Sequence, residues 1–146
     1  MTMMKQLLGA AGALALTAGA VAAEQALIYD LGGKFDKSFN VSALNGAERW
    51  AKETGGSYKE IEMQNEAQRE QALRRLAEAG SNPVVTTGFG MSDPIAKVSK
   101  DFPDTKFVTI DGWVDPAEYP NVLTIGFAEH EGSYLVGMMA ALASKT

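Results

Sequence analysis

The chain has 146 residues, of which 46% are hydrophobic and 21% charged, as in an ordinary globular protein of one or two small domains. Its formal net charge of −5 argues against nucleic acid as a partner, because phosphate binding needs a basic surface. It contains no cysteine, which excludes disulfides, thiolate nucleophiles and cysteine-ligated metal sites.

The first 23 residues are typical of a secretory signal peptide. Lys5 precedes the apolar stretch QLLGAAGALALTAGAVAA, which ends in small residues that fit cleavage after Ala22 or Ala23. A permanent membrane helix is the alternative, since about 18 residues is the lower limit for crossing a bilayer, but the stretch is rich in Ala and Gly. We therefore predict export to a bacterial periplasm, with no lipid anchor because the lipobox cysteine is missing.

The mature chain, residues 24–146, alternates between two periods of hydrophobicity. Short apolar or alternating runs predict strands at 25–31, 57–63, 83–88, 105–112 and 121–127. Apolar residues spaced by three and four predict helices at 38–54, 65–80, 92–103 and 131–145. We expect Asn65 and Asp93 to cap the second and third helices, and Tyr134, Leu135, Met138, Met139 and Leu142 to form the apolar side of the last one.

Strands that alternate with helices imply an α/β fold, a Rossmann-like parallel sheet with helices on both faces. In such sheets ligands bind beyond the carboxyl ends of the strands. Four of the predicted strand exits carry polar or aromatic side chains next to glycines, and this coincidence on one edge predicts a ligand cleft. The residues concerned are Phe35, Asp36, Ser38 and Asn40, then Gly88, Phe89 and Gly90, then Asp111 and Trp113, then Glu129, His130 and Glu131.

Each of these residues also has a purely structural interpretation. Asp36 and Ser38 can cap the helix that follows, Phe89 can belong to the core, and Asp111 precedes a glycine, as is common in turns. Arg69, Arg74 and Arg75 are expected to be solvated surface residues.

The residue types narrow the chemistry. The chain lacks G-x-G-x-x-G, the P-loop and G-x-S-x-G, and its single histidine makes a catalytic triad or a zinc site improbable. Carboxylates hold pairs of hydroxyls and aromatic rings stack on flat bases, so a neutral sugar or nucleoside is the favoured ligand. We expect no catalysis, no metal and no cofactor.

The segments ALIYDLGGKFDKSFNVSALNGAERW, TTGFG, FVTIDG and FAEHEGSYLVGMMAAL resemble the basic membrane protein family, over nearly the whole mature chain. These proteins are substrate-binding components of ABC importers and include the purine nucleoside receptors. The resemblance implies a type I periplasmic-binding-protein fold with two lobes that close about a hinge. It also implies that residues 24–146 cover most of the first lobe, with the second lobe absent.

The resemblance further implies a set of ligand contacts. Asp36 matches the motif aspartate that contacts ribose hydroxyls, Asp111 matches another aspartate that contacts the ligand, and Gly88 and Phe89 match the loop that lines the cleft. Two positions depart from the family: Phe35 stands where Asn or Asp is common, and Leu44 stands where an aromatic ring usually stacks on the base. The predicted ligand-binding residues are Phe35, Asp36, Asn40, Leu44, Gly88, Phe89 and Asp111.

The leading hypothesis is therefore a monomeric periplasmic protein that captures a nucleoside, with a purine nucleoside favoured, and delivers it to an ABC permease in the inner membrane. A periplasmic sensor that presents its ligand to a membrane receptor and a nucleoside hydrolase are the alternatives. The hypothesis requires Asp36 and Asp111 to lie on one edge of the sheet. Because only one wall of a two-lobed cleft would be present, we expect weak binding by this chain alone.

Overall fold

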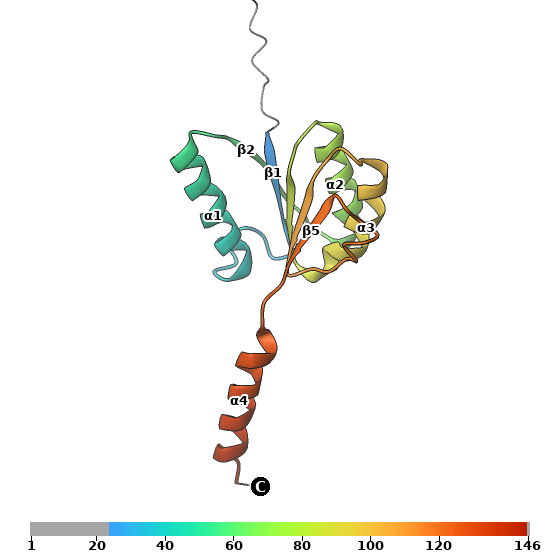
Figure 1. Cartoon of the computed structure of the whole chain (residues 1–146). Helices are drawn as coiled ribbons and strands as arrows, with labels where there is room; N and C mark the ends of the chain where they lie inside the picture. The colour runs from blue at the N-terminus through green and yellow to red at the C-terminus, as the bar shows by residue number, and fades with distance from the viewer. Residues whose placement is uncertain (1–23, 146) are drawn as a thin grey trace, which may run out of the picture.

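The computed structural model describes residues 24–145, so the predicted signal peptide lies outside the described residues (Figure 1). Five strands form one sheet in the order β2-β1-β3-β4-β5, and every neighbouring pair is parallel. This arrangement confirms the predicted α/β class. The strands are β1 (Gln25–Tyr29), β2 (Tyr58–Glu62), β3 (Val84–Thr87), β4 (Phe107–Ile110) and β5 (Val122–Ile125).

Helices cover both faces of the sheet, as predicted: α1 lies on one face, and α2 and α3 lie side by side on the other (Figure 1). The helices are α1 (Phe39–Thr54), α2 (Arg69–Glu78), α3 (Ser92–Asp101) and α4 (Glu129–Ala143), with 3-10 turns η1 (Glu66–Gln68) and η2 (Phe89–Met91) before α2 and α3.

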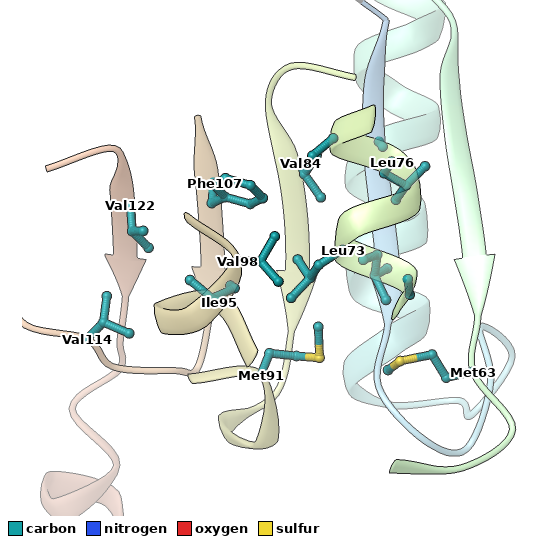
Figure 2. Packing of buried hydrophobic residues seen from close by; sticks show 14 residues of the cluster. Met63, Leu73, Leu76, Val84, Met91, Ile95, Val98, Phe107, Val114 and Val122 are labelled. Atoms are coloured by element: carbon teal, nitrogen blue, oxygen red, sulfur yellow. The ribbon is translucent and has the colours of Figure 1, made fainter. Parts of the chain in front are cut away.

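The interior strand β1 shows how the sequence specifies two packed faces. Its side chains alternate, so Ala26 and Ile28 join the cluster beneath α2 and α3, while Leu27 and Tyr29 join the cluster beneath α1. The first cluster is the larger one and includes Leu76, and Figure 2 shows Leu73 of α2 beside Val98 of α3 over the strands. Full burial of each such side chain stabilises the fold by about 2 kcal/mol.

Two predicted helix caps are wrong. The side chain of Asn65 makes no capping bond; instead the N–H of Gln64 donates to Oε1 of Gln68 at 2.6 Å. Asp93 lies inside the first turn of α3, because the turn η2 winds directly into that helix and moves its start to Ser92.

The face beneath α1 is only partly covered. α1 packs through Leu44 against Leu27 and Tyr29. Beside it runs an apolar groove whose lining includes Trp50 and Val85. Farther along the sheet, Leu123 and Ile125 of β5 are 59% and 39% exposed.

Helix α4 stands away from the sheet at the end of the short connection of residues 126–128 (Figure 1). None of its residues is buried, and its predicted apolar side is 46–85% exposed. We call this side, made of Tyr134, Leu135, Met138, Met139 and Leu142, the α4 stripe. No helix within residues 24–145 combines the length and the apolar character that crossing a membrane requires.

Candidate ligand-binding site

The carboxyl ends of all five strands lie at one edge of the sheet, because every neighbouring pair is parallel. The loop that carries Asp36 leaves β1 at this edge, Gly88 and Phe89 follow β3, and Asp111 follows β4. The structure thus places Asp36 and Asp111 on a common edge. We call it the carboxyl edge.

Asp36 caps the N-terminus of α1. Its Oδ1 accepts hydrogen bonds from the backbone N–H groups of Ser38 (2.9 Å) and Val41 (3.1 Å), and its Oδ2 accepts one from Asn40 (3.0 Å). The N–H of Asn40 is the main cause that lowers the pKa of Asp36, because backbone donors favour the charged carboxylate. The structure therefore shows the capping interpretation of Asp36 directly.

The lowered pKa makes a prediction about acid stability. Since the folded-state pKa of Asp36 lies below its unfolded value, the carboxylate adds stability at neutral pH, and this contribution is lost as the pH falls through the folded-state pKa. In urea unfolding curves, the stability difference between the native chain and Asp36→Asn should therefore be largest near neutrality and shrink as the pH falls through the folded-state pKa of Asp36. Asp104→Asn, in the exposed loop before β4, is the control. Identical pH profiles for the two variants would contradict the cap.

Asn40 is a buried residue that holds the loop after β1 in place at the carboxyl edge. It is 1% exposed, and its Oδ1 accepts from the Asp30 N–H (3.1 Å) and from the Thr87 hydroxyl (2.9 Å). Its Nδ2 donates to the carbonyls of Asp30 (3.0 Å) and Gly33 (3.1 Å). All the hydrogen-bonding capacity of the amide is thus used within the protein. Asn40 links the loop after β1 to β3 by these hydrogen bonds, and its amide has no hydrogen-bonding group left for a ligand.

The two positions that depart from the family pattern differ in exposure. Leu44 is 6% exposed and packs from α1 against Leu27 and Tyr29, so it faces the sheet and not the carboxyl edge. Phe35 is 72% exposed, with the Lys34 ammonium 5.5 Å from its ring centroid. The covering of a ligand ring by Leu44 has no support in this packing.

Gly88 and Phe89 leave β3 in a tight turn. Gly88 has φ +95°, and a Cβ atom on it would collide with the Asp30 carboxylate, so the position requires glycine. Phe89 is 73% exposed, which makes its interpretation as a core residue wrong. Asp111 is also exposed; it has φ +59°, and its N–H donates to the Ile125 carbonyl at 2.7 Å.

A hollow of about 540 Å³ joins Asp111 to the first turns of α1 and the start of α4. Asp36 is absent from its lining and lies just before it, at the cap of α1. Two of its lining residues carry carboxylates, two carry hydroxyls and two carry aromatic rings. Its lining residues are Phe39, Ser42, Ala43, Thr87, Ile110, Asp111, Phe127 and Glu129.

Arg69 was expected on the solvated surface, and this expectation is wrong. Its side chain is only 14% exposed, and its guanidinium pairs with Asp30 (3.4 Å) and Glu66 (3.6 Å). Arg69 is the first residue of α2, and helices that follow parallel strands begin at the carboxyl edge. Its position in the sequence could therefore have indicated that it lies at this edge. No group of three or more His, Asp or Glu side chains within residues 24–145 is arranged to hold a metal ion.

Comparison with known proteins agrees with this fold. The chain is 34% identical over 126 residues to the CD4+ T-cell-stimulating antigen of Listeria monocytogenes, covering 83% of this chain and 35% of that protein. It is 30% identical over 125 residues to an ABC transporter nucleoside-binding protein of Lactococcus lactis (83% and 35%) and 30% identical over 123 residues to a purine-binding protein of Brucella abortus (84% and 29%). The chain thus spans about a third of the length of the curated relatives it matches.

Solved structures show the same relationship. An ABC transporter solute-binding protein from Aeropyrum pernix matches with a TM-score of 0.72 and 31% identity, over 82% of this chain and 32% of that one. One from Conexibacter woesei matches with a TM-score of 0.59 and 33% identity, over 72% and 35%. The family model described as ABC transporter substrate-binding protein PnrA-like matches residues 23–146. The chain therefore belongs to this family, the basic membrane protein family predicted from its motifs.

Proposed function

We propose that this chain forms one ligand-binding wall of the solute-binding component of an ABC importer. In this proposal the protein captures a nucleoside outside the cytoplasm and delivers it to a membrane permease. Family membership supports the importer role, and the printed functions of the relatives from Lactococcus and Brucella support a nucleoside or purine ligand.

The observation that carries the proposal is the hollow at the carboxyl edge. It brings the carboxylates of Asp111 and Glu129 together, beside the exposed ring of Phe127. Carboxylate oxygens accept hydrogen bonds from neighbouring hydroxyls, as on a ribose. In this proposal the two carboxylates hold the hydroxyls of the sugar.

The rest of the proposal follows from the family. Residues 24–146 supply first-lobe material, and the predicted signal peptide directs the chain to the periplasm. A ligand that touches two lobes favours the closed state by its differential affinity for that state. A single wall makes only part of these contacts, so this chain alone should bind weakly.

Nuclear magnetic resonance titration of the mature chain tests the proposal. We expect adenosine, guanosine or inosine to bind with a dissociation constant in the millimolar range, about −4 kcal/mol. The amide shifts that move should be those of the loop after β1, of Gly88 and of Asp111. Asp111→Asn should abolish the shift changes, whereas Asp104→Asn should not.

Two outcomes would contradict the proposal. The proposed nucleoside site would be contradicted by amide shift changes confined to residues far from the carboxyl edge. It would also be contradicted by the absence of shift changes at saturating nucleoside. A micromolar dissociation constant would instead contradict the expectation that one wall binds weakly.

A further inference from the structure

Two large aromatic side chains project into solvent from neighbouring strand exits. Phe89 follows β3 and is 73% exposed, and Trp113 follows β4 and is 64% exposed. The two strands are hydrogen-bonded neighbours, with Thr87 paired to Ile110 at their ends. Exposing two rings to water is unfavourable, so their shared position at the carboxyl edge calls for something that covers them.

The hydroxyl of Ser92 links the two exits. Ser92 is 9% exposed, and its Oγ donates to the Phe89 carbonyl at 2.9 Å while it accepts from the Trp113 N–H at 3.0 Å. The backbones that carry the two rings are therefore fixed relative to each other before any ligand arrives.

Glycines next to Phe89 and Trp113 allow the backbone to pack closely against neighbouring side chains. A Cβ atom on Gly88 would collide with Asp30, one on Gly90 with the Arg69 guanidinium, and one on Gly112 with Thr109. Because Asp30, Arg69 and Thr109 occupy the space next to these glycines, the rings of Phe89 and Trp113 are exposed to solvent.

The two rings line the same hollow, of about 550 Å³, between the start of α3 and the loop after β4. Asp93, Asp115 and Arg69 share its lining. Exposed rings with carboxylate acceptors and a guanidinium donor around them suit a flat heterocycle that carries amino and carbonyl groups.

We propose that Phe89 and Trp113 are the base-stacking residues of this chain, and this inference rests on the proposed nucleoside function. Leu44 cannot take this part because it is buried between α1 and the sheet. Trp113 follows Asp111 by two residues, so their Cα atoms are at most about 7 Å apart. In this proposal Asp111 contacts the ribose from one hollow and Trp113 contacts the base from the neighbouring one. The specificity for a base thus resides on the α3 side of the carboxyl edge.

Tryptophan fluorescence tests the inference directly. The chain has two tryptophans, so Trp50→Phe leaves Trp113 as the reporter; Trp50 lies in α1 and lines the groove beside it. We expect adenosine and free adenine to quench Trp113 and ribose to leave it unchanged. In the intact chain, Phe89→Ala and Trp113→Ala should each weaken adenosine binding at least about fivefold, measured by the amide shifts of the loop after β1. Leu123→Ala, an exposed apolar side chain within β5, should not weaken it.

The outcomes separate this inference from the function on which it rests. In one outcome, adenosine shifts the amides around Asp111 but does not quench Trp113, and Phe89→Ala binds adenosine with unchanged affinity. This result contradicts the stacking role of Phe89 and Trp113 and leaves the nucleoside site intact. In another outcome, adenine quenches Trp113 but no nucleoside shifts the amide signal of Asp111. This result supports the stacking role of the two rings and contradicts the ribose contact at Asp111. No quenching by either purine overturns the inference.

Discussion

Asn40→Ala is expected to lower the free energy of unfolding of the mature chain by about 3 kcal/mol. The amide of Asn40 is buried and makes four hydrogen bonds. Its removal leaves the carbonyls of Asp30 and Gly33 without this donor and opens a cavity beside Thr87. Urea unfolding followed by circular dichroism measures the loss.

Asn45→Ala provides a matched control on the same helix. Asn45 is exposed, and substitutions at such positions usually change stability by less than about 0.5 kcal/mol. If the two alanine variants unfold at the same urea concentration, Asn40 does not hold the loop after β1 in the way that the hydrogen bonds indicate.

The α4 stripe is expected to make the isolated mature chain self-associate. Sequence analysis predicted a monomer, but a row of five large apolar side chains, each at least 46% exposed, favours association with a second copy. Replacing Leu135 and Met139 by glutamate should convert concentration-dependent association into a monomer. Sedimentation velocity over a range of protein concentrations follows the change.

The opposite face of α4 supplies the control with equal charge. Ser133 and Ala140 lie on the side away from the stripe, so glutamate at both positions should leave the association intact. A native chain that sediments as a monomer at every concentration, or a control that dissociates as fully as the stripe variant, would contradict this role of the stripe.

The strands and their faces could be predicted because their signals are local. The short apolar run after residue 24 predicted β1, and alternation along it separates Ile28 from Leu27. Strands alternating with helices predicted the parallel sheet, which in turn placed the predicted strand exits on one edge. Helix starts were less predictable, because the turns η1 and η2 shift them by hydrogen bonds that no composition signal marks.

The roles of individual site residues depended on partners that are distant in the chain. The burial of Arg69 follows from Asp30, which lies 39 residues away. Periodicity identified the α4 stripe as apolar, but it does not say what a face packs against. For Asp36 the capping interpretation was available in the sequence, since its hydrogen-bond partners are only two to five residues away.

The link that Asn40 makes between the loop after β1 and Thr87 also bears on how a ligand would be received. Ordering a flexible loop during binding reduces affinity, because conformational freedom is lost at that moment. Here the loop is ordered when the protein folds, so encounter with a small molecule needs no rearrangement of this wall. Differences in ligand preference between relatives should then follow from the side chains that project from the edge, while the shape of the backbone beneath them stays constant.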